Sequence, residues 1–323
     1  MSKNTEIVGI DISKSTFDVY IPEKGYSQYA NTQQGFGQFK KELEHNSHCV
    51  MEFTGAYYYQ LAVYLHDQKL SVSVVNPLVI KRFMQMKQQR NKTDKSDAKM
   101  ISDYGYEQEL TQWEPDPDYV KESKNLYSSL ELYSKQSTAC KNQLHSLKSR
   151  GLTTGFLVRS IKRQLKHLKA EMELLEQELE KIVKEHQGDL YARLKTIPGI
   201  GNKTAALLIV STDGFKNFES NGQVSSFFGL APTERTSGSS IRGKSRISKI
   251  GNKKVRNHLF LCSFTACKCN PQCSALYERI VNKGKSKKLA LIAVANKLIK
   301  QAYGIAKSEL AYDPNYRSVL VKR

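Results

Sequence analysis

The chain has 323 residues, a length that suits two domains or one large domain with an appendage. It carries 50 Lys and Arg against 31 Asp and Glu, so its formal net charge is +19, and 39% of its residues are hydrophobic. This charge predicts a polyanionic partner. The sequence has neither an apolar run of the roughly 18 residues that a membrane span needs nor a basic-then-apolar leader. These features argue against membrane and secreted classes, and we expect a cytoplasmic protein with six free cysteines.

The positive charge is concentrated in the C-terminal part. Residues 196–323 contain 22 Lys and Arg against 6 Asp and Glu, whereas residues 1–195 contain 28 against 25. Residues 241–288 alone hold 13 basic side chains and one acid, Glu278. A surface of this kind attracts phosphates, and the alternative is a solvated basic face without a ligand.

The first third of the chain reads as α/β. Short apolar runs predict strands, and an amphipathic stretch around 61–65 predicts a helix between the third and the fourth of them. Strands that alternate with helices indicate an α/β domain. The segment 114–118 (Glu-Pro-Asp-Pro-Asp) stops any helix and marks a boundary. The predicted strands cover residues 7–10, 17–21, 49–51 and 70–75.

The middle of the chain predicts a long helical arm. Residues 119–186 contain no proline, and their only glycines are Gly151 and Gly155. Apolar residues recur there at alternating spacings of four and three, which is a heptad seam and indicates an α-helical hairpin or coiled coil. The partner of this seam is either the preceding helix or a second protomer, and we favour a homodimer. The seam consists of Ile161, Leu165, Leu168, Met172, Leu175, Leu179 and Ile182.

A helix-hairpin-helix-like element is predicted at 194–205. Its glycines, Gly199 and Gly201, would let backbone N–H groups approach a phosphate, and Lys203 follows at the start of the next helix. The alternative is a tight turn between helices with no ligand. We therefore predict three domains: an α/β domain at 1–113, the helical arm at 114–190 and a mainly α-helical domain at 191–323.

Four acidic residues form the candidate catalytic site. Asp11 and Glu52 each follow a short apolar strand, and Asp94 and Asp97 are three residues apart, so they share one face of a helix. Hard oxygen ligands of this kind suit Mg²⁺, and paired metal ions can stabilise the attacking oxygen and the leaving oxygen when a phosphodiester is exchanged. Each acid taken alone would be an ordinary surface or capping residue.

These residues belong to a set of motifs that resembles one family. The set resembles the DEDD insertion-sequence transposases, relatives of the Piv DNA invertase that are also called bridge-RNA-guided recombinases. The similarity is collinear from about residue 6 to 315, and Phe53 departs from it by replacing a small residue. The motifs are Gly9-Ile10-Asp11, Met51-Glu52-Phe53-Thr54-Gly55, Val75-Asn76-Pro77, residues 90–98, Ile197 to Gly201, Ser237 to Gly243 and Ile247 to Gly251.

The resemblance implies an N-terminal RuvC-like domain of RNase H type, with Asp11, Glu52, Asp94 and Asp97 as a tetrad that holds Mg²⁺. It implies a C-terminal transposase domain in which Ser237 is the nucleophile and forms a covalent phosphoserine with DNA. The partners it implies are donor and target DNA, a guide RNA encoded beside the gene, and further copies of the chain in a dimer or a synaptic tetramer. Candidate nucleic-acid contacts are Gly199, Gly201, Lys203, Arg242, Lys244, Arg246 and Lys249.

Two other functions stay open on sequence grounds. A RuvC-like structure-specific nuclease would use the same four acids with water as nucleophile, and then Ser237 would be dispensable. An architectural nucleic-acid-binding protein would use the basic tract alone, and then Asp11 would be dispensable. The residues Ser239 and Ser240 are as plausible as Ser237 if the loop is read without its family. The spacing of Cys267, Cys269 and Cys273 lacks the paired knuckles of common zinc sites.

Overall fold

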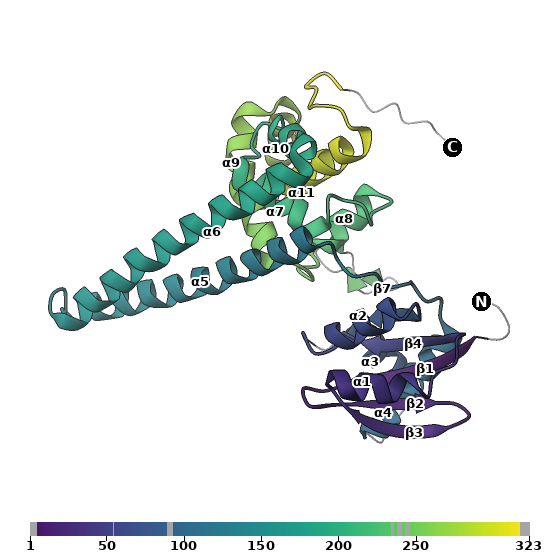
Figure 1. The fold of residues 1–323 in the computed structure, drawn as a ribbon. Helices are drawn as coiled ribbons and strands as arrows, with labels where there is room; N and C mark the ends of the chain where they lie inside the picture. The colour runs from purple at the N-terminus through teal and green to yellow at the C-terminus, as the bar shows by residue number, and fades with distance from the viewer. Residues whose placement is uncertain are drawn as a thin grey trace. The chain divides into compact units, whose positions relative to one another are not determined.

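The computed structural model describes residues 5–53, 55–88, 93–233, 236–237, 241–242 and 246–316. The chain divides into two compact units, Met1–Asp116 and Pro117–Arg323. Figure 1 shows the helices and strands of each unit. Each unit has its own hydrophobic core.

The first unit is built on a five-stranded sheet with the strand order β3-β2-β1-β4-β5. Strands β1, β4 and β5 run parallel to one another, and β2 and β3 are antiparallel to their neighbours. The strands are β1 (Glu6–Ile12), β2 (Thr16–Ile21), β3 (Gly25–Ala30), β4 (Ser47–Glu52) and β5 (Ser71–Val75).

Helices cover both faces of this sheet. The main core of the unit lies under α1 (Gln33–Lys40) and α2 (Tyr59–Asp67), where Phe36 and Leu61 pack against the strands. The opposite face carries α3 (Pro77–Met86) and α4 (Asp94–Glu107), and a smaller cluster of Ile7, Val50, Ile80 and Ile101 fills that side (Figure 1). The strands and the helix predicted in this unit are confirmed; β3, α1 and α3 were not predicted.

The second unit begins with a helical hairpin formed by α5 (Asp118–Ser149) and α6 (Phe156–Lys195). The predicted seam of α6 lies against α5 of the same chain, where Ile161 and Leu168 are buried together with Cys140. The hairpin prediction is confirmed. Within this chain the preceding helix covers these apolar side chains, and the homodimer stays a prediction.

Five further helices complete the second unit, with a core that also includes the inner ends of α5 and α6. Among the described residues, α11 is long and apolar enough to cross a membrane, but its Val294 and Leu298 are fully buried in this core. All six cysteines are free, as predicted. The helices are α7 (Asn202–Thr212), α8 (Asn221–Phe227), α9 (Lys253–Cys269), α10 (Pro271–Asn282) and α11 (Lys287–Ser308).

Candidate active site and serine segment

Asp11 and Glu52 lie at the carboxyl ends of two neighbouring parallel strands. Strands β1 and β4 pair in parallel with Ile10 opposite Met51, so the next residue along each strand is the predicted acid. Because side chains alternate between the faces of a sheet, Asp11 shares the face of Gly9, and Glu52 that of Val50. This is the face that α4 covers.

The contact between α4 and β1 is unusually close at Gly9. A Cβ atom built on Gly9 would lie 2.1 Å from the carbonyl oxygen of Ala98 and 2.4 Å from the backbone nitrogen of Ser102. The Ser102 hydroxyl donates a buried hydrogen bond of 2.9 Å to the Ile7 carbonyl. The helix therefore lies directly on the strand backbone, and its first turn reaches the end of β1 that carries Asp11.

A capping box fixes where α4 begins. The Thr93 hydroxyl accepts a hydrogen bond from the backbone N–H of Ser96, and the Ser96 hydroxyl accepts one from the N–H of Thr93. Asp94 and Asp97 fall in the first helical turn, where the positive end of the helix dipole favours carboxylates. Asp97 is buried and Asp94 is exposed.

The four predicted acids act on one another electrostatically. Partial burial and then the charges of Asp97, Glu52 and Asp94 raise the pKa of Asp11 from 3.8 to about 6. The charges of the three other predicted acids thus act on Asp11. Nevertheless, the described residues contain no group of three or more His, Cys, Asp or Glu side chains placed closely enough to hold a metal ion.

A fifth acid, Asp18, was not predicted as part of this group. It pairs with Asp11 across the antiparallel strands β1 and β2, and it also raises the pKa of Asp11. Asp18 is buried, and it accepts hydrogen bonds from the Tyr26 hydroxyl at 2.5 Å and from the Gln28 amide at 3.0 Å. The available sequence signal was its position seven residues after Asp11 across a tight hairpin.

Replacing Asp11 by asparagine should stabilise the metal-free protein at neutral pH. A raised carboxyl pKa means that ionisation of Asp11 costs folding free energy as the pH rises from about 4 through about 6. Two pKa units correspond to about 3 kcal/mol, and partial exposure reduces this to about 1 to 2 kcal/mol. Urea unfolding in EDTA should show this gain at pH 7.5 and none at pH 4. Equal stability of the two proteins at pH 7.5 would contradict the electrostatic cost.

The side chain of Phe53 does not disturb Glu52. The Phe53 ring is half exposed and packs against Tyr58 at a centroid distance of 5.0 Å, while its backbone N–H donates to the Val75 carbonyl at 2.9 Å. The larger residue is therefore accommodated on the surface. Strand β4 keeps its pairing with β5 up to Glu52.

The predicted nucleophile, Ser237, lies in a short two-stranded ladder. Strand β7 (Thr236–Ser237) pairs with β8 (Ile241–Arg242) and places Ser237 opposite Ile241. A second ladder joins β6 (Pro232–Thr233) to β9 (Arg246–Ile247). Of the predicted phosphate contacts in this segment, Arg246 and Lys249 are exposed. Lys244, Ser239 and Ser240 lie outside the described residues, and of Ser237 and Arg242 only the backbone is described.

The two ends of this serine segment, residues 229–251, are held together at their base. The guanidinium of Arg256 donates to the carbonyls of Phe228 at 2.9 Å and of Gly251 at 3.0 Å. The backbone N–H of Lys249 donates to the Gly229 carbonyl at 3.2 Å. The segment is therefore anchored to α9, which carries Arg256.

Two of the three predicted phosphate-binding residues of the helix-hairpin-helix-like element, Gly199 and Lys203, make contacts within the chain. A Cβ on Gly199 would lie 2.8 Å from the Cβ of Ala266, so this glycine permits close packing on α9. The ammonium of Lys203 pairs with Glu176 of α6. Gly201 is exposed at the N-terminus of α7 and has no neighbour within 4 Å of an added Cβ. Of the three residues, Gly201 is therefore the one whose surroundings are open to a phosphate.

Comparisons with known proteins cover both units. Residues 8–149 match a model of DEDD-type IS110 transposases, and residues 191–278 match a model described as the Transposase IS116/IS110/IS902 family.

Full-length relatives agree with these matches. The pilin gene-inverting protein of Moraxella lacunata is 31% identical over 323 residues, and that of Moraxella bovis is 30% identical over 322 residues; each alignment covers 95% of this chain and 97% of the relative. The transposase of insertion sequence IS1328 from Yersinia enterocolitica is 25% identical over 288 residues, covering 80% of this chain and 83% of the relative. The chain therefore belongs to the IS110 family of transposases, DNA-processing enzymes of recombination that are similar in sequence to the pilin gene-inverting proteins.

Proposed function

We propose that the protein is an insertion-sequence recombinase that cuts and rejoins DNA through a covalent phosphoserine on Ser237. The observation that carries the proposal is the gathering of Asp11, Glu52, Asp94 and Asp97 at one end of the sheet, where their charges raise the pKa of Asp11. The strand order, with the antiparallel strands β2 and β3 on one side of the parallel strands β1, β4 and β5, supports a RuvC-like assignment of the RNase H type for this unit. The serine segment supplies the second element of the site.

Magnesium is the cofactor that these acids fit best. All four donors are carboxylates, which are hard oxygen ligands, and a divalent cation would offset the repulsion felt by Asp11. Asp11, Glu52, Asp94 and Asp97 would hold it by closing on the ion, because the described acids of the metal-free structure are not placed closely enough to do so. When bound, such an ion supplies Lewis acidity for phosphodiester exchange. The acids themselves are positioned by β1, β4 and the capped start of α4.

The serine step conserves the phosphodiester linkage. The Ser237 hydroxyl loses its proton as Oγ attacks the phosphorus and a new P–Oγ bond forms. The P–O bond to the leaving strand breaks, and the leaving oxygen takes up a proton, so that one proton is lost and one is gained. Attack by a new strand end reverses these changes and frees the serine. Exposed Arg246 and Lys249 follow Ser237 in the sequence and would bind neighbouring phosphates.

The proposed partners are donor and target DNA and a guide RNA encoded beside the gene. The +19 net charge supports binding of both nucleic acids. Exchange of two duplexes requires synapsis, for which we propose a tetramer assembled from dimers. In this assembly the acids of one protomer and the serine of another form a composite site, so that cleavage depends on assembly. The proposed location is the cytoplasm, with association to the nucleoid during activity.

A search for protein-linked DNA tests the proposal. The protein is incubated with Mg²⁺, the noncoding RNA that flanks its gene and DNA carrying the junction of the element, and is then denatured. We expect a phosphoserine adduct that both Ser237→Ala and Asp11→Asn abolish, and omission of the RNA shows whether guidance is required. Free cut ends that form without an adduct, and that Ser237→Ala still produces, would identify a hydrolytic nuclease instead.

A further inference from the structure

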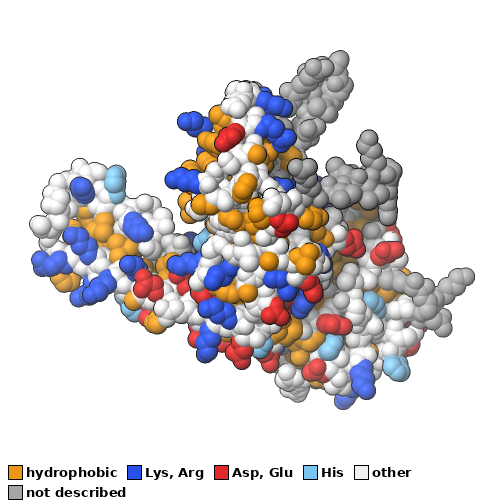
Figure 2. Space-filling model, turned by 90° about the horizontal axis from the view of Figure 1, so that it is seen from above, with side chains coloured by type: hydrophobic (Ala, Val, Ile, Leu, Met, Phe, Trp, Pro, Cys, Tyr) orange, Lys and Arg blue, Asp and Glu red, His pale blue; other side chains and the backbone are white. Residues whose placement is uncertain are grey.

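The outer and inner parts of the helical hairpin carry opposite net charges. Residues 132–170, its outer part, contain nine Lys and Arg and no Asp or Glu, whereas residues 171–190 contain seven acids and two lysines. All nine basic side chains are exposed. Among the described residues, one of these nine side chains forms an ion pair: Lys169 lies 3.8 Å from Glu173. Figure 2 shows Lys and Arg on the projecting end of the hairpin.

Most of these cations lie on one side of the hairpin. On each helix they directly follow a residue of the seam: Lys162 and Lys166 follow Ile161 and Leu165, and Lys141 follows Cys140. In an antiparallel pair of helices, positions that follow the seam fall on the same side of both helices. This basic face consists of Lys141, Lys148, Arg159, Lys162, Lys166 and Lys169.

The opposite side of the outer hairpin is nearly neutral. The exposed positions that precede the seam residues there carry no Lys, Arg, Asp or Glu. The asymmetry is therefore a property of one face and not of the whole arm. The glutamine and histidine residues of this neutral face are Gln136, Gln143, Gln164 and His167, and all four are exposed.

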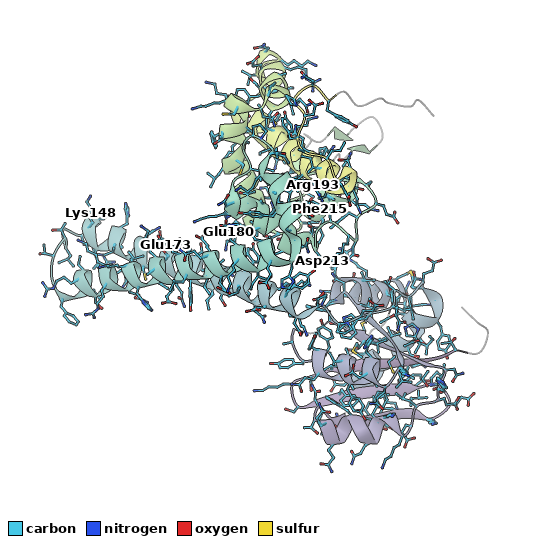
Figure 3. All side chains as sticks on the ribbon, turned by 45° about the horizontal axis from the view of Figure 1, so that its top comes forward. Lys148, Glu173, Glu180, Arg193, Asp213 and Phe215 are labelled. Atoms are coloured by element: carbon cyan, nitrogen blue, oxygen red, sulfur yellow. The ribbon has the colours of Figure 1, made fainter. Side chains whose placement is uncertain are left out.

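Nearer the C-terminal helices, the same side of the hairpin changes sign and contacts α7. The stripe of α6 that begins with Arg159 continues into Glu173, Glu176 and Glu180. Glu176 pairs with Lys203, and Glu180 accepts a hydrogen bond from the Asn202 amide at 3.1 Å. Figure 3 shows Lys148 at the outer end of the hairpin, Glu173 partway along it and Glu180 near its base. The inner acids thus have partners within the chain, and the outer cations face solvent.

We infer that the basic face binds the phosphate backbone of double-stranded DNA, independently of base sequence. The four cations of α6 on this face span ten residues, or about 15 Å, and B-DNA carries a charge every ~1.7 Å of its axis, so several phosphates lie within their reach. The exposed N-terminus of α7 at Gly201 belongs to the element that contacts the base of this face. The inference rests on the proposed function for its choice of DNA as the partner.

The test compares two variants of the full-length protein in EDTA, where no strand cleavage is possible. The first, K141Q/K148Q/K162Q/K166Q, removes four cations of the basic face. The second adds Q136K, Q143K, Q164K and H167K, which restores the net charge on the neutral face. All eight positions are exposed, and Lys and Gln have similar helix propensities, so the fold should persist. Fluorescence anisotropy with a duplex of arbitrary sequence measures the affinity as a function of salt.

We expect both variants to bind DNA at least tenfold more weakly than the unmodified protein. The slope of log affinity against log salt should fall by up to about 3.6, because each of the four lost phosphate contacts removes roughly 0.9. Full recovery in the second variant would overturn the inference, since total charge would then suffice. Weakened binding of an RNA hairpin with unchanged binding of DNA would also overturn it. A missing Ser237 adduct, by contrast, would remove the proposed chemistry and leave these binding results intact.

Discussion

The Gly9→Ala protein should lose DNA cleavage by about 100-fold or more, because an ångström of misplacement at a reacting site can cost that much. The added methyl group would have to occupy space within 2.1 Å of the Ala98 carbonyl oxygen, which is backbone and cannot rotate away. Helix α4 must therefore move off β1 and carry Asp94 and Asp97 away from Asp11. Overpacking of this kind should also lower the free energy of unfolding by about 3 kcal/mol.

The matched control is Gly37→Ala in α1, where an added Cβ meets nothing closer than the Tyr64 hydroxyl at 3.9 Å. In a helix this change should stabilise by about 0.5 to 1 kcal/mol and leave cleavage unchanged. Cleavage assays on a junction substrate, together with urea unfolding, measure both effects. Normal cleavage by Gly9→Ala would show that the close contact between α4 and β1 does not position the acids.

The Gly251→Ala protein should form the serine adduct at least about 100-fold more slowly. Gly251 has a φ of 112°, a conformation that an alanine rarely adopts, and its added Cβ would lie 2.0 Å from the Phe227 carbonyl oxygen. The base of the serine segment would have to open, and the hydrogen bond from Arg256 to Gly251 would be lost with it. Adduct yield after denaturation is the measurement.

For this variant the control is Gly304→Ala in α11, where no atom lies within 4 Å of an added Cβ. It should form the adduct at the normal rate. The stability of the first unit should be the same in both proteins, because Gly251 and Gly304 lie in the second. An unchanged adduct rate in Gly251→Ala would mean that the anchoring of residues 229–251 is irrelevant to the position of Ser237.

Local patterns predicted much of the first unit and of the arm. Apolar runs that end in an acid located β1 and β4, because a buried parallel strand is a short continuous apolar segment. Gly9, two residues before Asp11, is where α4 packs on β1. The sequence shows the glycine but does not show which backbone approaches it. Strand β3, with its exposed Tyr26 and Gln28, lacked the apolar alternation that identifies a half-buried strand.

Long-range pairing was less predictable. The heptad seam of α6 is the same whether α5 or another chain covers it, so the sequence alone could not choose between them. Asp18 was missed because its importance comes from cross-strand pairing with Asp11, and its burial depends on Tyr26 and Gln28 of the neighbouring strand. The role of Gly199 as a packing glycine likewise required the position of Ala266, which lies far away in the sequence.

Helix α6 is kinked near its base. At Gln187 the backbone leaves helical geometry, with φ at −140° and ψ at 38°. The ring of the neighbouring His186 stacks on the ring of Tyr119, in the first turn of α5, with the two centroids 4.3 Å apart. The kink in α6 therefore lies beside the first turn of α5. From there to Phe156 is about 47 Å at 1.5 Å per residue. A change of one degree in the kink angle at Gln187 would therefore move the outer end of the hairpin by about 0.8 Å.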